Sequence, residues 1–459
     1  MVIFKNKIFY NIKFLLKKNI TLYKISVILF NFITKAYLFY NFKKFLKILP
    51  NIEQKKLIIK EKKILFTISR IANGGAEKQF IKLAELIKKK KIKSLFLAFD
   101  LKLNNNKNYY EYLQKKKFKN IKLIKIRNVY KELKNISKKK EIRSILKTHN
   151  LNFFDDVEKL MFLHTYIITL NYKPSIIHSY LDTPNIFAGI IGAITNVKKV
   201  VISLRSISPN NFEWCRFFYL EIYKLLLNYK KIIFVANSKN GALSYSEWLN
   251  CKKNKIKLIN NIYNFKKKIN NNSRKKINNN KKKIITFGTI GRLDDNKNTI
   301  YSIRLIETLV KKYKLNIKFF IVGEGLLKNS LVEYVLKNNL NNNIKFLGEK
   351  KNLSSFFNNI DVFIFSTKIE GTPNVLLEAQ NYQLPIFSTN VGGISDAVIK
   401  NYTTYFLNGN NLDNDASIIY KKLSSNNFLK NRSFLYIKKK LKKFSDYEVY
   451  KNLTKIYNV

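Results

Sequence analysis

The sequence predicts an α/β protein of two doubly wound domains, each a parallel sheet with helices on both faces. First, 459 residues, 46% of them hydrophobic, are enough for two large domains with buried cores. Second, short apolar runs alternate with helix-length segments in two separate series, as in β-α-β units. Third, residues 261–283 separate the two series with nine basic residues, no acid and Asn triplets, which is typical of a low-complexity linker. We therefore expect the two domains to face each other across a cleft.

Residues 1–60 are expected to form a basic amphipathic extension. The first 50 residues contain ten lysines and no acidic residue, with apolar runs such as Ile25–Thr34 between them. Lys24 and Lys35 bound that run, so it is too short to span a bilayer, and it lacks the small-residue cleavage site of a secretory signal. Two interpretations remain open: an element that binds an anionic membrane surface, or a helical extension packed on the protein.

The first domain is predicted over residues 61–260. A helix over Ala76–Lys91 follows the first strand, and the lysine- and asparagine-rich stretch Asn104–Thr148 is interpreted as an insertion or surface helices around a short strand. The apolar runs that predict strands are Ile64–Ser69, Ser94–Phe99, Ile121–Ile126, Ser175–Ser179, Lys199–Leu204 and Ile232–Ala236.

The second domain is predicted over residues 284–440, and residues 441–459 are expected to form a helix that packs back on the first domain. Ligands of such sheets bind at the carboxyl ends of the strands. The predicted strands are Ile284–Ile290, Ile317–Val322, Ile344–Leu347, Val362–Ser366 and Ile386–Ser388. The predicted helices are Asn298–Lys312, Leu326–Lys337 and Asn374–Tyr382.

The net charge of the chain is strongly positive, since 87 Lys and Arg oppose 29 Asp and Glu, which gives +58. Such a charge favours anionic partners and suggests a nucleic-acid-binding protein. However, Lys, Asn, Ile, Phe and Tyr are abundant along the whole chain, which is typical of the codon bias of an AT-rich genome. The charge therefore carries little functional information, and we expect no specific nucleic-acid partner.

Cysteine and histidine are too scarce for several classes of site. Cys215 and Cys251 form no Cys-x-x-Cys pair, so neither a disulfide framework nor a thiolate zinc site is expected, and a reducing cytosol is the default setting. Three histidines offer no metal constellation, and no metal site is predicted. They are His149, His164 and His178.

Glycine is also scarce, and ten of the 14 glycines lie at predicted strand ends on the ligand-facing edge. One motif, Gly74-Gly75-Ala76-Glu77, follows the first strand and opens a helix. Its backbone N–H groups can approach a phosphate, and the helix dipole adds positive potential. No third glycine completes a dinucleotide-binding fingerprint, and an ordinary turn is the alternative.

A second motif, Gly291-Arg292-Leu293 with Lys297, follows the first strand of the second domain. Arg292 and Lys297 flank a tight turn and can converge on a diphosphate. The alternative is two surface cations among 87. The neighbouring aspartates are interpreted as solvated turn residues rather than metal ligands.

A third motif runs from Glu370 through Gly371–Val375 to Glu378. The loop places free N–H groups at the start of a helix. Two carboxylates then flank an anion-binding turn, which suits an anion that carries hydroxyl groups. Ordinary acidity at a helix N-terminus is the alternative.

Together these motifs resemble those of the GT-B glycosyltransferases of family 4, the glycosyl transferases group 1, over roughly residues 63–409. The resemblance implies a retaining, metal-independent enzyme that uses a nucleotide-sugar as co-substrate, needs no cofactor and commonly builds lipopolysaccharide, capsule or other glycolipids. The motifs that carry it are Glu370-x7-Glu378, Gly291-Arg292-Leu293 with Lys297, the turn Val322–Gly325 and Gly74–Glu77.

The resemblance also implies roles for individual residues. Glu370 is expected to bond donor-sugar hydroxyls as a catalytic residue, and Glu378 to grip the ribose diol. The stretch Phe346–Glu349 is expected near the base. The other residues implied to bind the donor are Gly75, Arg292, Lys297, Gly371, Thr372, Pro373, Asn374 and Val375.

The acceptor side departs from the family pattern. Where members often carry His-x-His, this chain keeps only His178, which is expected to face the donor or the acceptor as a second catalytic residue, with a structural histidine as the alternative. Arg205 stands where members often carry His, and Tyr180 lies beside it at the predicted strand ends. We assign both to the acceptor side.

The predicted function is therefore transfer of a sugar, with retention, to a lipid-linked or polysaccharide acceptor by a cytoplasmic enzyme that sits peripherally at the inner face of the plasma membrane. The alternatives are a nucleotide-sugar 2-epimerase of the same architecture and a nucleic-acid-binding protein. An inactive paralogue is disfavoured by the intact Arg292, Lys297 and Glu370.

Overall fold

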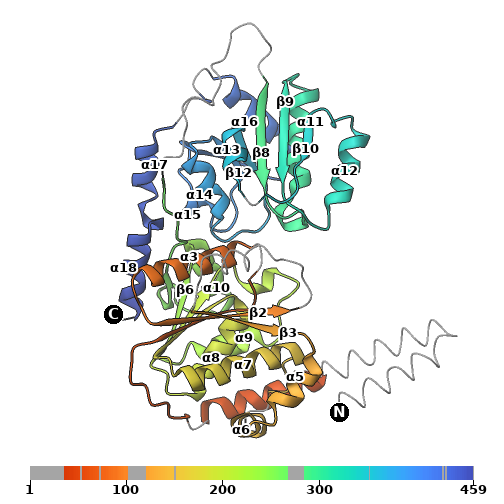
Figure 1. The fold of residues 1–459 in the computed structure, drawn as a ribbon. Coiled ribbons are helices and arrows are strands. Elements are labelled where there is room, and N and C mark those ends of the chain that lie inside the picture. The colour runs from red at the N-terminus through yellow and green to blue at the C-terminus, as the bar shows by residue number, and fades with distance from the viewer. Residues whose placement is uncertain are drawn as a thin grey trace, which may run out of the picture.

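A computed structural model describes most of the chain as two α/β domains, each built on one parallel sheet (Figure 1). The predicted fold class is confirmed. The structure describes residues 36–51, 54–71, 74–101, 120–148, 151–266, 284–350, 352–425, 428–429 and 432–457.

The sheet of the first domain has the order β3-β2-β1-β4-β5-β6-β7. All its pairings are parallel, so the carboxyl ends of its strands share one edge. The short edge strand β7 was not predicted. The strands are β1 (Ile64–Ile68), β2 (Ser94–Leu101), β3 (Ile121–Ile126), β4 (Ile176–Tyr180), β5 (Lys199–Leu204), β6 (Ile232–Ala236) and β7 (Ile256–Leu258).

Helices cover both faces of this sheet and close two apolar cores, one on each side. The capping box between Asp155 and Glu158 fixes the start of α7, and the almost entirely buried α8 packs against β4 and β5. The helices are α3 (Gly75–Lys89), α5 (Val129–Ile136), α6 (Lys140–Thr148), α7 (Asp156–Tyr172), α8 (Asp182–Ile194), α9 (Tyr219–Leu226) and α10 (Lys239–Trp248).

The sheet of the second domain has the order β10-β9-β8-β11-β12-β13, again parallel throughout. Its short edge strand β13 was not predicted either. The strands are β8 (Ile285–Ile290), β9 (Ile317–Val322), β10 (Ile344–Phe346), β11 (Val362–Phe365), β12 (Ile386–Thr389) and β13 (Thr404–Leu407).

Two further apolar cores lie on the two faces of this second sheet. The helices are α11 (Thr299–Lys311), α12 (Lys328–Lys337), α13 (Ser354–Asn358), α14 (Asn374–Asn381), α15 (Ile394–Ala397), α16 (Leu412–Leu423) and α17 (Phe434–Lys440). Single 3-10 turns occur at Leu49–Asn51, Pro209–Asn211, Lys253–Lys255, Asp295–Lys297 and Lys442–Phe444.

The chain crosses between the domains twice. Residues 261–266, the first part of the predicted linker, are not a solvated tether, because Ile262, Tyr263 and Phe265 are buried. Residues 267–283 lie outside the described part. On the return, α18 (Asp446–Tyr457) runs beside the first domain, and its Leu453 and Tyr457 join the core there (Figure 1).

The predicted N-terminal extension is described only from residue 36. Residues 36–48 form a helix whose Phe42 and Phe45 are buried in the core of the first domain. Ile25–Thr34 lies outside the described residues. Within the described part, no helix combines the length and apolar character needed to cross a membrane.

Candidate active site

The start of α3 lies against the start of α14, so the two domains meet at two helix N-termini. Gly75, the first residue of α3, follows β1. Its carbonyl accepts a hydrogen bond of 3.1 Å from Asn374 Nδ2 of α14. A Cβ on Gly75 would lie 3.4 Å from that nitrogen, an ordinary van der Waals contact, so the two helices meet closely at this point.

Glu77 occupies the space beside the Gly74 turn. Its carboxylate is buried, and a Cβ on Gly74 would lie 2.1 Å from its Oε2. Burial raises the pKa of Glu77, while its own backbone, Arg70 and Arg292 oppose that rise. Of these two arginines, Arg292 belongs to the second domain.

The Gly291–Lys297 turn is held by the backbone and by Asp294. Gly323 has φ +140°, and a Cβ there would lie 1.8 Å from the Gly291 carbonyl oxygen, so this close approach requires glycine. Asp294 Oδ1 accepts from the Lys297 backbone N–H at 3.0 Å, and Asp294 Oδ2 lies 3.0 Å from Arg292 Nε. The Arg292 side chain is 66% exposed, so it remains at the mouth of the cleft.

Lys297 and Glu370 form an ion pair, and both side chains are largely buried. Lys297 Nζ also lies 5.3 Å above the ring of Phe365 at the end of β11. This contact joins two motifs that were predicted from the sequence, since Lys297 belongs to the second motif and Glu370 begins the third.

The loop from Glu370 to α14 packs tightly on the first domain. A Cβ on Gly371 would lie 2.6 Å from the Arg205 carbonyl oxygen. Thr372 Oγ1 donates to the Asn237 carbonyl at 2.8 Å. Among the described residues, no acceptor is bonded to the backbone N–H groups of Gly371, Thr372, Asn374 and Val375. These amides can therefore serve an anion, as the sequence predicts.

A buried amide network joins three segments around Asn374. Its Oδ1 accepts from Gln79 Nε2 at 2.7 Å and from Asn261 Nδ2 at 2.9 Å. Asn261 Nδ2 also donates to the Thr372 carbonyl at 3.0 Å, and the Ile262 backbone N–H donates to Gln79 Oε1 at 2.6 Å. The network fixes α3, the interdomain crossing and α14 relative to one another.

Glu378, one turn into α14, forms an ion pair with Lys78 of α3. The pair lines a cavity of about 560 Å³ between α3, residues 262–266, α13 and α14. Lys82 lines the same cavity and donates to the Ile262 carbonyl at 3.0 Å. Burial, helped by the Lys78 charge, lowers the pKa of Lys82 to about 8.

Tyr180 and Arg205 stand together at the carboxyl ends of β4 and β5. The guanidinium carbon of Arg205 lies 4.7 Å from the Tyr180 ring centroid, and its NH2 donates to Asn261 Oδ1 at 2.5 Å. The Arg205 Nε is buried and has no hydrogen-bond partner among the described residues. Burial lowers the pKa of Arg205, which is the cost of holding this cation beside the cleft.

His178 does not face the cleft, and its predicted catalytic role does not fit the structure. The side chain is fully buried, its Nδ1 lies 2.5 Å from Tyr457 Oη, and its Nε2 lies 2.7 Å from Ser203 Oγ. Burial, with a contribution from Arg205, lowers its pKa to about 3, so the ring is neutral. His178 has no free nitrogen for a substrate and instead ties β4 to α18 and β5.

Most predicted donor-side residues converge, but several partners were missed from the sequence. Lys78, Gln79 and Asn261 hold Glu378 and Asn374, and the only signal for the first two was their position directly after Glu77. In the part of the chain that the structure describes, no group of three or more His, Cys, Asp or Glu side chains could hold a metal ion. His149 lies outside that part.

Residues 269–436 match the family model described as Glycosyl transferases group 1. An uncharacterized glycosyltransferase of Methanocaldococcus jannaschii is 32% identical over 49% of this chain, and the match spans 57% of that relative's own length. The capsular polysaccharide biosynthesis glycosyltransferase CapM of Staphylococcus aureus is 25% identical over 67% of this chain and 82% of its own length. The predicted resemblance to the glycosyl transferases group 1 is confirmed for residues 269–436.

Solved structures agree with the fold. Anabaena HepE in complex with UDP and glucose matches with a TM-score of 0.65 at 15% identity, over 87% of this chain and 100% of that chain. A glycosyltransferase of Rickettsia africae matches with a TM-score of 0.62 at 18% identity, over 87% of this chain and 99% of that chain. These likenesses support the GT-B architecture of two facing domains.

Proposed function

We propose that this chain is a retaining, metal-independent glycosyltransferase with a nucleotide-sugar donor. The proposal starts from the match of residues 269–436 to the glycosyl transferases group 1. The observation that carries the proposal is the interdomain contact around α14. Two lysine–glutamate pairs, Lys297–Glu370 and Lys78–Glu378, flank the amide-lined loop Gly371–Val375. This arrangement suits a ligand with an anionic centre between two hydroxyl-bearing ends.

The diphosphate of the donor is assigned to the loop Gly371–Val375. Unpaired amides at a helix start bind phosphate oxygens, and Lys297 adds a cation within reach of that loop. Arg292 lies at the mouth of the cleft, and Gly75 offers the start of α3 from the opposite domain. In transfer, the same groups stabilise the charge that develops on the leaving diphosphate.

Glu370 and Glu378 are assigned to the two hydroxyl-bearing ends of the donor. Glu370, before the loop, accepts hydrogen bonds from donor-sugar hydroxyls, and Glu378, inside α14, accepts them from the ribose diol. Both carboxylates are held by lysines in the structure. Donor binding therefore adds hydroxyl donors to carboxylates whose charge and orientation are already fixed.

The sugar passes through an oxocarbenium-like state as its bond to the diphosphate breaks. We assign no covalent nucleophile and no role to His178 in this step. The departing phosphate oxygen accepts the acceptor hydroxyl proton on the same face, so the anomeric configuration is retained.

The acceptor is proposed to enter beside Tyr180 and Arg205, at the edge of the first sheet. A relative from Campylobacter jejuni, 34% identical over 25% of this chain and 31% of its own length, is named for an undecaprenol-diphosphate-linked acceptor. We propose a lipid-linked acceptor of the same general kind, and hence an enzyme peripheral to the cytoplasmic face of the plasma membrane, within capsule, lipopolysaccharide or similar glycan synthesis.

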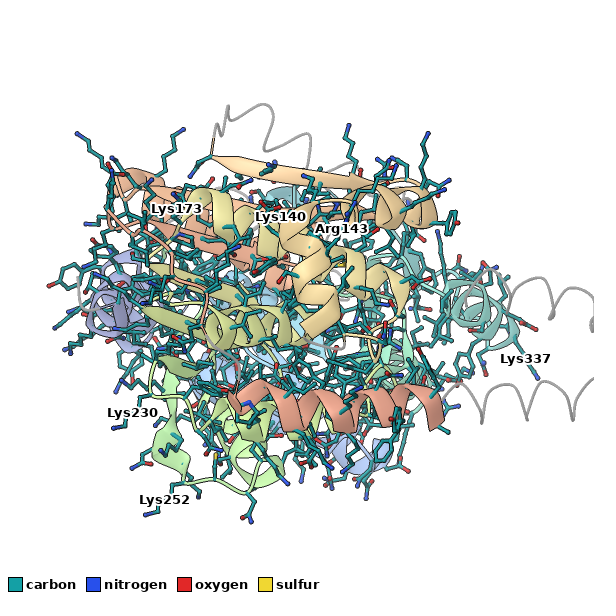
Figure 2. The ribbon with its side chains drawn as sticks, turned by 90° about the horizontal axis from the view of Figure 1, so that it is seen from below. Lys140, Arg143, Lys173, Lys230, Lys252 and Lys337 are labelled. Carbon is teal, nitrogen blue, oxygen red and sulfur yellow. The ribbon has the colours of Figure 1, made fainter. Side chains whose placement is uncertain are left out.

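The distribution of charge does not favour the nucleic-acid alternative. The basic side chains labelled in Figure 2 come from several elements of both domains, such as α6 with Lys140 and α12 with Lys337. The labelled side chains are Lys140, Arg143, Lys173, Lys230, Lys252 and Lys337.

The donor assignment is tested by thermal unfolding of the full chain with UDP-, GDP- and dTDP-sugars. One class should raise the unfolding temperature with saturation, because a ligand that binds only the folded state stabilises it. Lys297→Met should lose that rise while Lys312→Met, an exposed pair with Asp413, keeps it. No rise with any nucleotide-sugar would contradict the proposal.

A further inference from the structure

The first domain exposes a group of large aromatic side chains that its fold does not require. Phe39 and Tyr40 point outward from the helix 36–48 and are 50% and 67% exposed. Trp214 and Phe217, from the loop between β5 and α9, are 51% and 47% exposed. We refer to these four side chains as the aromatic patch.

The two halves of the aromatic patch are in contact. The Phe39 and Phe217 ring centroids are 6.2 Å apart, and Phe217 also packs edge-on against the buried Phe42 at 5.6 Å. Trp214 is stacked on Phe212 at 4.9 Å, so its indole is braced by its own loop. The Phe39–Phe217 contact therefore joins the helix 36–48 to the loop that carries Trp214.

The outward face of the helix 36–48 is both aromatic and basic. After Phe39 and Tyr40 it presents Lys43, Lys44 and Lys47, all exposed, and Lys43 Nζ lies 5.2 Å from the Phe39 ring centroid. The inward face buries Phe42 and Phe45, so the helix is firmly docked while its other face is left to the surroundings.

The segments next to the aromatic patch in the sequence are also positively charged. The 35 residues that lead into this helix carry seven lysines and no acidic residue. In the loop, Glu213 is the only acid between residues 205 and 218, and Arg216 is paired with Asp155 and Glu158 of the α7 start. Exposed Trp, Tyr and Phe beside lysines are the side chains that favour the headgroup region of an anionic bilayer.

The loop that carries Trp214 and Phe217 begins in the cleft. Its first residue is Arg205, whose carbonyl oxygen lies against Gly371 and whose guanidinium packs on Tyr180. One segment of 14 residues thus joins the proposed acceptor side to the aromatic patch.

We infer that the aromatic patch is an interfacial surface that inserts into the headgroup region of an anionic lipid bilayer and holds the cleft beside it. Only the role that we give to this insertion rests on the proposed function: a lipid-linked acceptor would then reach Arg205 without leaving the membrane. The insertion itself follows from the exposed aromatics and lysines.

The direct test uses tryptophan fluorescence, because the chain has only Trp214 and Trp248. The full chain with Trp248→Phe reports on Trp214 alone. With vesicles of phosphatidylglycerol and phosphatidylcholine, we expect a blue-shifted emission that brominated lipid tails quench. Vesicles of phosphatidylcholine alone should give a much smaller shift.

A second measurement is vesicle sedimentation at low and high salt. The triple variant Phe39→Gln/Tyr40→Gln/Trp214→Gln should lose most of the salt-resistant bound fraction. The control Tyr130→Gln/Tyr447→Gln removes two exposed aromatics that lie outside the patch and should retain it. Both variants must keep the wild-type unfolding temperature and nucleotide-sugar response, which separates this inference from the donor assignment.

Three results would overturn the inference. Vesicle binding with unshifted, unquenched Trp214 would place the contact in residues 1–35 or in nonspecific charge. Equal release of the triple variant and the control at high salt would do the same. If the Trp214 emission shifts without vesicles and the shift depends on protein concentration, the patch binds a second copy of the chain instead.

Discussion

Lys78 of α3 is ion-paired with Glu378 of α14, although 300 residues separate them in the chain. A cation of one domain thus neutralises the carboxylate that we assign to the donor ribose in the other. The Glu378 side chain is only 12% exposed, so without Lys78 it would be a nearly buried, unpaired charge.

The first prediction concerns this pair. Lys78→Met should raise the donor KM several-fold with a smaller change in kcat, because Glu378 loses the group that orients it. The Lys78→Met/Glu378→Gln double variant should be less impaired than the sum of the singles, since the pair acts as a unit. Steady-state kinetics of the four proteins checks this, and strictly additive effects would show that the pair is unimportant.

The second prediction concerns the diphosphate. Lys297→Ala or Arg292→Ala should weaken donor binding by about 1.5–3 kcal/mol, the range of a charge-assisted hydrogen bond. Isothermal titration with the nucleoside diphosphate alone measures this without any turnover. Lys368→Ala, an exposed pair with Asp295 in the same region, is the matched control and should bind as wild type. Unchanged affinity in both site variants would show that the diphosphate does not bind at this turn.

The third prediction separates the two carboxylates. Glu370→Gln should lower kcat, because its bond is directed at the reacting sugar. Glu378→Gln should mainly raise the donor KM, because ribose binding is uniform through the reaction. Initial rates over a range of donor concentrations distinguish them, and two variants with wild-type constants would show that the assignment is wrong.

The fourth prediction follows from His178, whose pKa is lowered to about 3 by burial. The unfolded chain binds a proton at this residue near pH 6.5, while the folded chain does not until near pH 3. Above pH 6.5 both states are neutral, so the residue costs no stability there. As the pH falls from about 6.5 towards 3, it lowers the free energy of unfolding by up to about 1.4 kcal/mol per pH unit.

Denaturant titrations of His178→Gln across that range should show a shallower loss of stability than wild type. Because glutamine can still bond Tyr457 and Ser203, the variant should also retain most of its transfer activity at neutral pH. If His178→Gln is fully stable but has no turnover, His178 is a catalytic residue after all.

The sequence predicted most of the fold because buried parallel strands appear as short apolar runs between helices. It missed β7 and β13, which are edge strands of three and four residues with partly solvated side chains. It also extended the linker back to residue 261. The buried Ile262–Phe265 stretch is held there by contacts with α3 and α14, and these contacts are tertiary.

The sequence predicted site residues only where they belong to a recognisable motif. Glu370, Lys297 and the loop after Gly371 lie in recognisable patterns, whereas Asn261 is one asparagine among many in a lysine- and asparagine-rich chain. The burial of His178 depends on Tyr457, which lies 279 residues away at the other end of the chain. No local pattern reports such a contact.

We propose that the interdomain site transfers a sugar from a nucleotide-sugar to a lipid-linked acceptor. The most direct measurement incubates the full chain with the radiolabelled nucleotide-sugar that stabilises it and a bacterial lipid-linked glycan fraction. We expect label in the organic phase with wild type and with Lys368→Ala, and its loss with Lys297→Ala and Glu370→Gln. Equal labelling by all four proteins, or none with wild type for every donor that binds, would contradict the account.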